Sequence, residues 1–152
     1  MQKIILASQS PRRKDLLSHI VAKFSVQAAD IDESVLANES PTTYVSRLSL
    51  EKAQHIFSSN SDAIVIGSDT SVIINNNILG KPADLQDCIK ILSLLSNKKH
   101  QVITAFTVMS KNKTITQVVS TDVLFKVLNE EEIINYWHTG EPQDKAGAYA
   151  IQ

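Results

Sequence analysis

The feature that most constrains this fold is the alternation of short apolar runs with amphipathic segments that begin at a Ser-Pro pair. The apolar run Ile4–Ala7 predicts a buried strand, and Ser10-Pro11 then supplies an N-cap and a first-turn proline for a helix to about Ile20. The same signal recurs at Ser40-Pro41, before an amphipathic stretch that reaches about Phe57. Strand-like and helix-like segments in alternation predict an α/β fold.

The rest of the chain continues this pattern. Apolar or β-branched runs predict strands at Phe24–Ala28, Ala63–Ile66, Ser71–Ile74, Gln101–Met109 and Ile115–Val127. Helix-capping signals with apolar periodicity predict helices at Asp84–Leu95 and Asn129–His138. The stretch "GSDT" is expected to connect two strands, "NNN" to form a polar turn, and "SKNK" to close an antiparallel hairpin. We therefore expect a mixed twisted sheet with flanking helices.

Length and composition exclude several classes of protein. A chain of 152 residues with 43% hydrophobic residues is long enough for one globular domain, or for two small lobes that share a core. Fifteen basic against sixteen acidic residues give a net charge of −1, and only 5% of residues are aromatic, which argues against a nucleic-acid partner. No apolar run is long enough to span a bilayer, and "MQKIILAS" is too short for a signal peptide, so we expect a cytoplasmic protein without a membrane partner.

Two further features concern the core and the end of the chain. Cys88 falls at helical spacing with Leu85, Leu92 and Leu95, so we interpret it as a core residue rather than a nucleophile. The final segment "DKAGAYAIQ" stops among small and apolar residues, and we expect the natural domain to continue beyond Gln152.

The opening stretch "ASQSPRRKDLL" places two arginines in the first turn of a helix. That end of a helix already carries a partial positive charge, so Arg12 and Arg13 are unfavourable there unless an anion faces them. They are either surface arginines or part of an anion cradle. In the second case Ser8 and Ser10 add hydroxyl groups, and the arginines offer forked donors that suit phosphate.

Lys52 interrupts an apolar stripe. It falls among Val45, Leu48 and Ile56, where a helix of this kind would carry an apolar side chain. Its ammonium group either reaches the solvent along the helix surface or points into a cleft. The sequence leaves both readings open.

Two carboxylates are candidates for chemistry. Asp69 follows the buried-looking run "AIVIGS" and is either a turn-forming residue or a base and metal ligand. Glu33, in an acidic loop, matters if Asp69 needs a partner for Mg²⁺, which binds one or two carboxylates together with substrate phosphates. Lys81, between a glycine and a proline, is either a solvated loop lysine or a charge aimed by a stiff backbone.

The sequence also lacks the signatures of other chemistries. It has no Cys/His cluster typical of zinc and no Walker-type glycine loop, and Ser8 and Ser10 have no nearby histidine to activate them. A phosphate-bearing substrate with Mg²⁺ fits the candidate residues best.

Seven segments, in order along almost the whole chain, carry a family resemblance. They are "LASQSPRRKDLL", "DIDES", "YVSRLSLEKA", "GSDTSVI", "LGKP", "HQVITA" and "DKAGAYAIQ". In these segments the chain resembles the Maf (septum formation protein) family of nucleoside triphosphate pyrophosphatases. The resemblance implies two lobes around a central cleft, as in inosine triphosphate pyrophosphatases, and hydrolysis of a nucleoside triphosphate to the monophosphate and pyrophosphate with a divalent cation, Mg²⁺ or Mn²⁺.

The resemblance also implies roles for individual residues. Asp69 would accept the proton of the attacking water and contact the metal, and Glu33 would be its metal-binding companion. Five residues would hold the triphosphate: Ser8, Arg12, Arg13, Lys52 and Lys81. Arg12, Thr70 and Gln152 match the branch that acts on dTTP and UTP, whereas a 7-methyl-GTP branch typically has a tryptophan in place of the first arginine.

The chain departs from the family pattern in two places. Asn97 stands where the family usually has glycine. The family also continues past Gln152 with a further strand and helix, so we expect residues 1–152 to be a single Maf-like domain that lacks this part.

The alternative to an enzyme is a non-catalytic nucleotide-binding regulator of cell division and septum formation. A homodimer is an option that the sequence leaves open.

Overall fold

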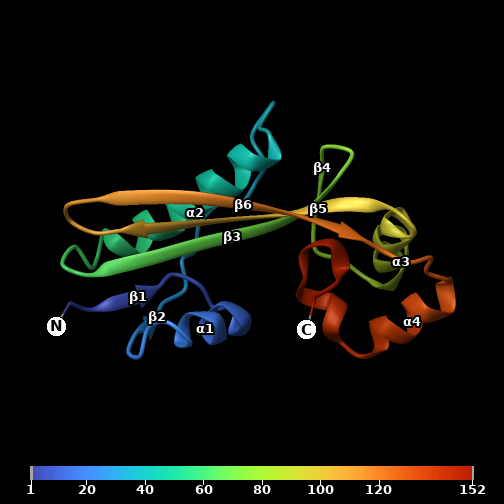
Figure 1. The fold of residues 1–152 in the computed structure, drawn as a ribbon, viewed down its shortest axis with the longest axis horizontal. Helices are drawn as coiled ribbons and strands as arrows, with labels where there is room; N and C mark the ends of the chain where they lie inside the picture. The colour runs from blue at the N-terminus through green and yellow to red at the C-terminus, as the bar shows by residue number, and fades with distance from the viewer. Residues whose placement is uncertain (1, 152) are drawn as a thin grey trace. The chain divides into compact units, whose positions relative to one another are not determined.

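The computed structural model of the chain describes residues 2–151 (Figure 1). Within these residues, four α-helices and six strands account for most of the regular structure. The helices are α1 (Pro11–Ser18), α2 (Pro41–Phe57), α3 (Leu85–Leu95) and α4 (Glu130–His138), and the strands are β1 (Ile4–Leu6), β2 (Ser25–Val26), β3 (Ile64–Ile74), β4 (Asn77–Leu79), β5 (Lys99–Met109) and β6 (Thr114–Leu124). Two short 3₁₀ turns, Glu141–Asp144 and Ala146–Ala148, follow α4.

The strands form one mixed sheet. Its order is β2-β1-β3-β5-β6, and β4 pairs with β3 off this path. Strand β1 lies parallel to both β2 and β3, with Ile5 opposite Ser25 on one side and Val65 on the other, whereas β4 runs antiparallel to β3. Strands β5 and β6 are neighbours joined by a turn in which the Ser110 N–H donates to the Lys113 carbonyl. The predicted mixed α/β sheet and the "SKNK" turn are confirmed.

The predicted helix starts are confirmed, and each rests on a local side-chain cap. Ser10 and Ser40 accept hydrogen bonds from backbone N–H groups in the first turns of α1 and α2, ahead of prolines that need no such bond. Asp84 caps α3, and Asn129 forms a complete capping box with Glu132 in α4.

Several predicted boundaries were too wide. Helix α1 ends at Ser18 rather than near Ile20, β2 is limited to Ser25–Val26, and β6 ends at Leu124 rather than Val127. Element ends depend on hydrogen-bond partners outside the element, which a local pattern does not specify.

The main error of the sequence reading concerns β3. Two strands separated by a "GSDT" connection were predicted, but a single strand runs from Ile64 to Ile74 through Gly67 and Asp69. A side chain at Gly67 would place its Cβ 2.2 Å from the Ser49 carbonyl oxygen. The glycine therefore allows β3 to lie close to α2, and it does not form a turn. Asp69 stays in the strand because it finds a buried cationic partner there.

Four of the asparagines that the structure describes have left-handed backbone, and two of them form the turn before β4. Asn75 (φ 49°) and Asn76 (φ 62°) form the two-residue connection between Ile74 and its cross-strand partner Asn77, which confirms the predicted polar turn. Asn97 has φ 53°, a conformation that asparagine tolerates better than most residues. The replacement of the family's usual glycine by Asn97 therefore keeps the backbone conformation that glycine would favour.

The chain forms two compact units, which confirms the predicted division into two lobes. Of the described residues, the first unit comprises 2–69 and 104–119, and the second comprises 70–103 and 120–151. The core of the first unit consists of Ile5, Ala7, Ala53, Ile56, Ala63, Val65 and Met109. The core of the second consists of Val72, Ile74, Cys88, Ile91, Leu92, Leu95, Ile133 and Ala148, so Cys88 is a core residue as predicted.

Candidate active site

A lysine between two carboxylates forms the centre of the candidate site, in the first unit. The Lys52 ammonium donates to Asp69 Oδ1 at 2.9 Å and lies 2.9 Å from Glu33 Oε1. The side chains of Lys52 and Asp69 are each only 10% exposed, whereas that of Glu33 is 53% exposed. Of the two readings of Lys52, the structure supports the one in which its ammonium group points inward.

The packing of α2 on β3 explains why these two side chains meet. Gly67 and Asp69 lie on the same face of β3, because alternate residues of a strand share a face. Gly67 lets β3 approach the turn of α2 that contains Ser49 and Ala53, with a would-be Cβ 2.8 Å from the Ala53 N atom. Lys52 belongs to that same turn, so its side chain reaches Asp69 across the contact.

Beside this pair lies a cluster of donors at the start of α1. The Arg13 guanidinium donates through Nη1 to Ser8 Oγ at 3.2 Å, and the Ser10 N–H donates to the same oxygen at 3.2 Å. Ser8 is buried, Arg13 is half-buried, and the first turn of α1 contains no acidic residue. Arginine, hydroxyl and backbone N–H groups at a helix N-terminus together favour a phosphate ligand.

Burial and neighbouring charges shift the pKa values of two site residues in the first unit. Burial raises the pKa of Asp69, and the nearby positive charges of Lys52 and Arg13 oppose that rise. Burial lowers the pKa of the Arg13 guanidinium, while the negative charge of Asp69 raises it. Arg13 and Asp69 are therefore close enough to interact electrostatically, and a carboxylate with a raised pKa is a better proton acceptor than an ordinary one.

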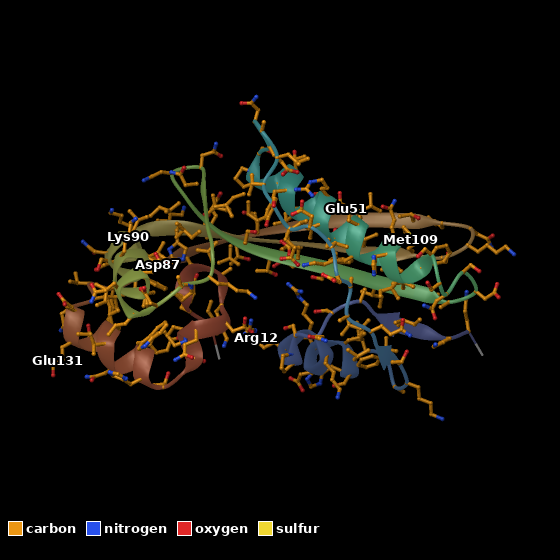
Figure 2. All side chains as sticks on the ribbon, turned by 180° about the vertical axis from the view of Figure 1, so that it is seen from behind. Arg12, Glu51, Asp87, Lys90, Met109 and Glu131 are labelled. Carbon is orange, nitrogen blue, oxygen red and sulfur yellow. The ribbon has the colours of Figure 1, made fainter. Side chains whose placement is uncertain are left out.

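The structure brings together five of the predicted residues: Ser8, Arg13, Glu33, Lys52 and Asp69. Arg12 is exposed on the first turn of α1 and projects from that helix (Figure 2). Lys81 and Thr70 belong to the second unit, where the Lys81 ammonium pairs with Asp144 Oδ1 at 2.9 Å. Gln152 lies outside the described residues.

The carboxylates fit a divalent cation only in part. Among residues 2–151, no group of three or more His, Cys, Asp or Glu side chains is placed to hold a metal ion. Glu33 and Asp69 nevertheless converge on one positive charge, and two carboxylates are a sufficient protein contribution for Mg²⁺ when substrate phosphates supply further oxygens. The donor set thus suits a hard cation that binds together with its substrate.

The sequence reading missed a second cluster, which holds the loop that carries Glu33. Arg47 of α2 binds Glu39 and the Ser34 carbonyl, and the Tyr44 hydroxyl donates to the Glu33 carbonyl at 2.8 Å. One available signal was the spacing of Arg47 and Glu51, four residues apart on one helix, which indicates an ordinary surface pair. A second was the segment "YVSRLSLEKA" of the family resemblance, which contains both Tyr44 and Arg47.

Two solved structures show the fold class to which the chain belongs. The Ham1 protein of Staphylococcus aureus is similar with a TM-score of 0.57 at 15% identity, covering 80% of this chain and 70% of that one. A HAM1 protein of Coxiella burnetii has the same TM-score at 16% identity, covering 82% and 73%. The chain thus has an α/β fold of the Ham1 type, which confirms the predicted fold class.

The family follows from sequence similarity. The family model described as Maf-like protein matches residues 3–152, and the chain belongs to this family. A relative from Colwellia psychrerythraea, named dTTP/UTP pyrophosphatase, is 53% identical over 99% of this chain and 74% of its own length. A Bacillus cereus relative with the same name is 45% identical over 100% of this chain and 80% of its own length.

A separate finding concerns the lengths of the helices. Within residues 2–151, no helix combines the length and the apolar character that crossing a bilayer requires.

Proposed function

We propose that the protein hydrolyses nucleoside triphosphates, with dTTP and UTP as preferred substrates, to the monophosphate and pyrophosphate. The observation that carries this proposal is the cluster in the first unit, where Lys52 joins Asp69 and Glu33 beside Arg13 and Ser8. The names of the relatives from Colwellia psychrerythraea and Bacillus cereus support the same activity and the same pair of nucleotides.

In the proposed reaction, Asp69 is the general base. A water oxygen attacks the α-phosphorus in line with the bond to the bridging oxygen, and Asp69 takes a proton from that water. The bond between the α-phosphorus and the bridging oxygen breaks, and pyrophosphate leaves with the electron pair. Because Lys52 binds Oδ1 of Asp69, we assign the other oxygen, Oδ2, to the water.

The cationic side chains have a separate task. Arg13, with Ser8 and the N-terminus of α1, would bind phosphate oxygens, and Lys52 would neutralise charge close to the base. General base catalysis contributes about 10²–10⁴-fold, so positioning and charge neutralisation must supply most of the acceleration. Arg12, Lys81, Thr70 and Gln152 keep the substrate-binding roles that the family resemblance implies, as predictions.

A divalent cation, Mg²⁺ or Mn²⁺, would be held by Glu33 and Asp69 with substrate oxygens, and when bound it supplies positive charge to the phosphates. The cytoplasm stays the predicted location because its nucleoside triphosphates are the proposed substrates.

Pyrophosphate release from a panel of nucleoside triphosphates, with Mg²⁺ or Mn²⁺, tests the proposal. We expect release from dTTP and UTP to exceed release from the purine nucleotides and from 7-methyl-GTP. A protein that only binds nucleotides, as the alternative of a cell-division regulator requires, releases none. The variant Arg12→Trp tests the selectivity: a profile unchanged from the wild type would remove Arg12 from substrate choice.

A further inference from the structure

We infer that Arg47 is a positioning residue for Glu33. Through Glu39 and the Ser34 carbonyl, Arg47 holds the loop of residues 33–39 against α2, so that the Glu33 carboxylate stays beside Lys52 and Asp69. The functional part of this inference rests on the proposed function, whereas its structural part concerns only the loop.

The contacts of Arg47 use its whole guanidinium group. Nε and Nη2 bind the two oxygens of Glu39 at 2.6 and 2.9 Å, which is the forked geometry that arginine and a carboxylate form together. Nη2 also donates to the Ser34 carbonyl at 2.9 Å, and Nη1 donates to Glu51 at 3.1 Å. The side chains of Glu39 and Arg47 are 4% and 18% exposed, so the pair is only partly open to solvent.

The same loop is held at further points along its backbone. Glu39 Oε2 accepts the Leu36 N–H at 2.9 Å, and the Tyr44 hydroxyl donates to the Glu33 carbonyl at 2.8 Å. The Arg47 guanidinium lies 5.6 Å from the centre of the Tyr44 ring, within the range of a cation–π contact. Arg47 and its neighbours therefore hold the backbone at residues 33, 34 and 36 and the side chain of Glu39.

This anchoring bears on Glu33 more than on Asp69. Asp69 is fixed by the hydrogen bonds of β3 and by burial, whereas Glu33 lies in a segment without helix or strand and has a half-exposed side chain. Fixing the backbone of a loop costs conformational entropy. A carboxylate in a loop therefore keeps one position only if other contacts hold that backbone. Arg47 thus acts on one of the two carboxylates and leaves the other in place.

Only an arginine can make all of these contacts at position 47. A lysine offers one compact charge and cannot bind both Glu39 oxygens and the Ser34 carbonyl in one fixed plane. We expect Arg47→Lys to keep the positive charge and the folded state but to loosen the loop.

Hydrogen exchange in the ligand-free protein is the first test. We expect Arg47→Met to speed the exchange of the amides in residues 33–39 by at least about tenfold, because hydrogen bonds to charged groups hold the loop closed. Glu51→Gln is the matched control: it weakens the pair within α2 and leaves the Glu39 and Ser34 contacts in place, so loop exchange should stay within about twofold of the wild type. If Arg47→Met does not fold, Arg47→Lys replaces it.

A second test asks whether Arg47 acts through Glu33. Binding of Mn²⁺ in the presence of a non-hydrolysable nucleotide, followed by the loss of the free-ion electron paramagnetic resonance signal, is measured for Arg47→Met, Glu33→Gln and the double variant. We expect each single variant to weaken Mn²⁺ binding and the double variant to bind like Glu33→Gln alone, whereas independent effects would multiply.

The outcomes separate the two proposals. Unchanged loop exchange in Arg47→Met, or multiplicative losses in the double variant, would overturn the positioning role. Absence of pyrophosphate release by the wild type would overturn the proposed function, and the exchange experiment would still decide whether Arg47 holds the loop.

Discussion

Two lysine–carboxylate pairs in this protein have the same length but different surroundings. Lys52 and Asp69, in the first unit, are 2.9 Å apart with both side chains 10% exposed. Lys81 and Asp144, in the second unit, are also 2.9 Å apart, with side chains 63% and 88% exposed. The distance between the charges therefore does not determine the energetic effect of a salt bridge. Solvent screens the exposed pair, whereas the buried pair is weakly screened and its charges have lost their hydration.

The difference has a direct chemical result. Burial raises the pKa of Asp69 even though Lys52 donates a hydrogen bond to it, so this carboxylate binds a proton more readily than an ordinary one. Its neighbours Glu33 and Arg13 add charges to the same small volume. The Lys81–Asp144 pair in the second unit lacks such burial, and each partner stays largely hydrated.

The largest effect expected from this contrast is on stability. Lys52→Met should lower the free energy of unfolding by about 3 kcal/mol, because it leaves a buried carboxylate without its partner. Lys81→Met, the matched variant in the second unit, should lower it by less than about 1 kcal/mol, because exposed pairs contribute little. Urea unfolding followed by circular dichroism measures both. Equal losses would show that burial does not distinguish the pairs.

The next effect is on catalysis. Asp69→Asn should reduce the rate of pyrophosphate release by at least about 10²-fold while nucleotide binding stays largely intact, because the amide cannot accept the proton of water. Asp144→Asn should change the rate by less than about fivefold, as the loss of an exposed pair allows. Steady-state kinetics and equilibrium nucleotide binding on both variants provide the comparison. Normal turnover in Asp69→Asn would exclude it as the base.

A smaller effect concerns two glycines. Gly67→Ala should destabilise the protein by about 1–3 kcal/mol, since its Cβ would lie 2.2 Å from the Ser49 carbonyl oxygen and force α2 away from β3. Gly80→Ala, in the second unit, has no atom within 4 Å of the added Cβ and should change stability by less than about 1 kcal/mol. Thermal unfolding of the two variants decides this, and a Gly67→Ala protein as stable as Gly80→Ala would contradict the close contact.

The smallest effect is a difference in acid sensitivity between the two units. In the second unit, burial lowers the pKa of His100 below its ordinary value of 6.5. The unfolded chain then binds the proton more readily, so stability is full above about pH 6.5 and falls as the pH falls through that value. In the first unit, the hydrogen bonds from Arg47 lower the pKa of Glu39 from 4.5 to about 2, so its contribution is lost only between those pH values.

The measurement is the unfolding midpoint as a function of pH for the wild type, His100→Gln and Glu39→Gln. The midpoint of His100→Gln should depend less on pH just below 6.5 than that of the wild type. The difference between the wild type and Glu39→Gln should persist to about pH 4.5 and shrink toward pH 2. A Glu39→Gln difference that disappears near neutral pH would show that Arg47 does not hold this carboxylate in its charged form.

The sequence by itself determined the parts of this protein that depend on near neighbours. The helix starts at Ser10, Ser40, Asp84 and Asn129 were predictable because each cap bonds a backbone group only three residues away. The asparagine turn at residues 75 and 76 and the core position of Cys88 follow from equally local signals, namely tolerance of positive φ and helical spacing. Most candidate site residues stood out by charge and position alone, and the family resemblance supplied their individual roles and added Thr70 and Gln152.

Only the tertiary structure decided what those residues contact. Lys52 could have reached the solvent, and Asp69 could have formed a turn; they bind each other because Gly67 lets β3 approach α2, a contact between residues far apart in the chain. For the same reason β3 is one strand instead of two, since a buried partner lets Asp69 remain within it. The Arg47 anchor of the Glu33 loop was likewise invisible, because it joins a helix to a loop whose course no periodicity specifies.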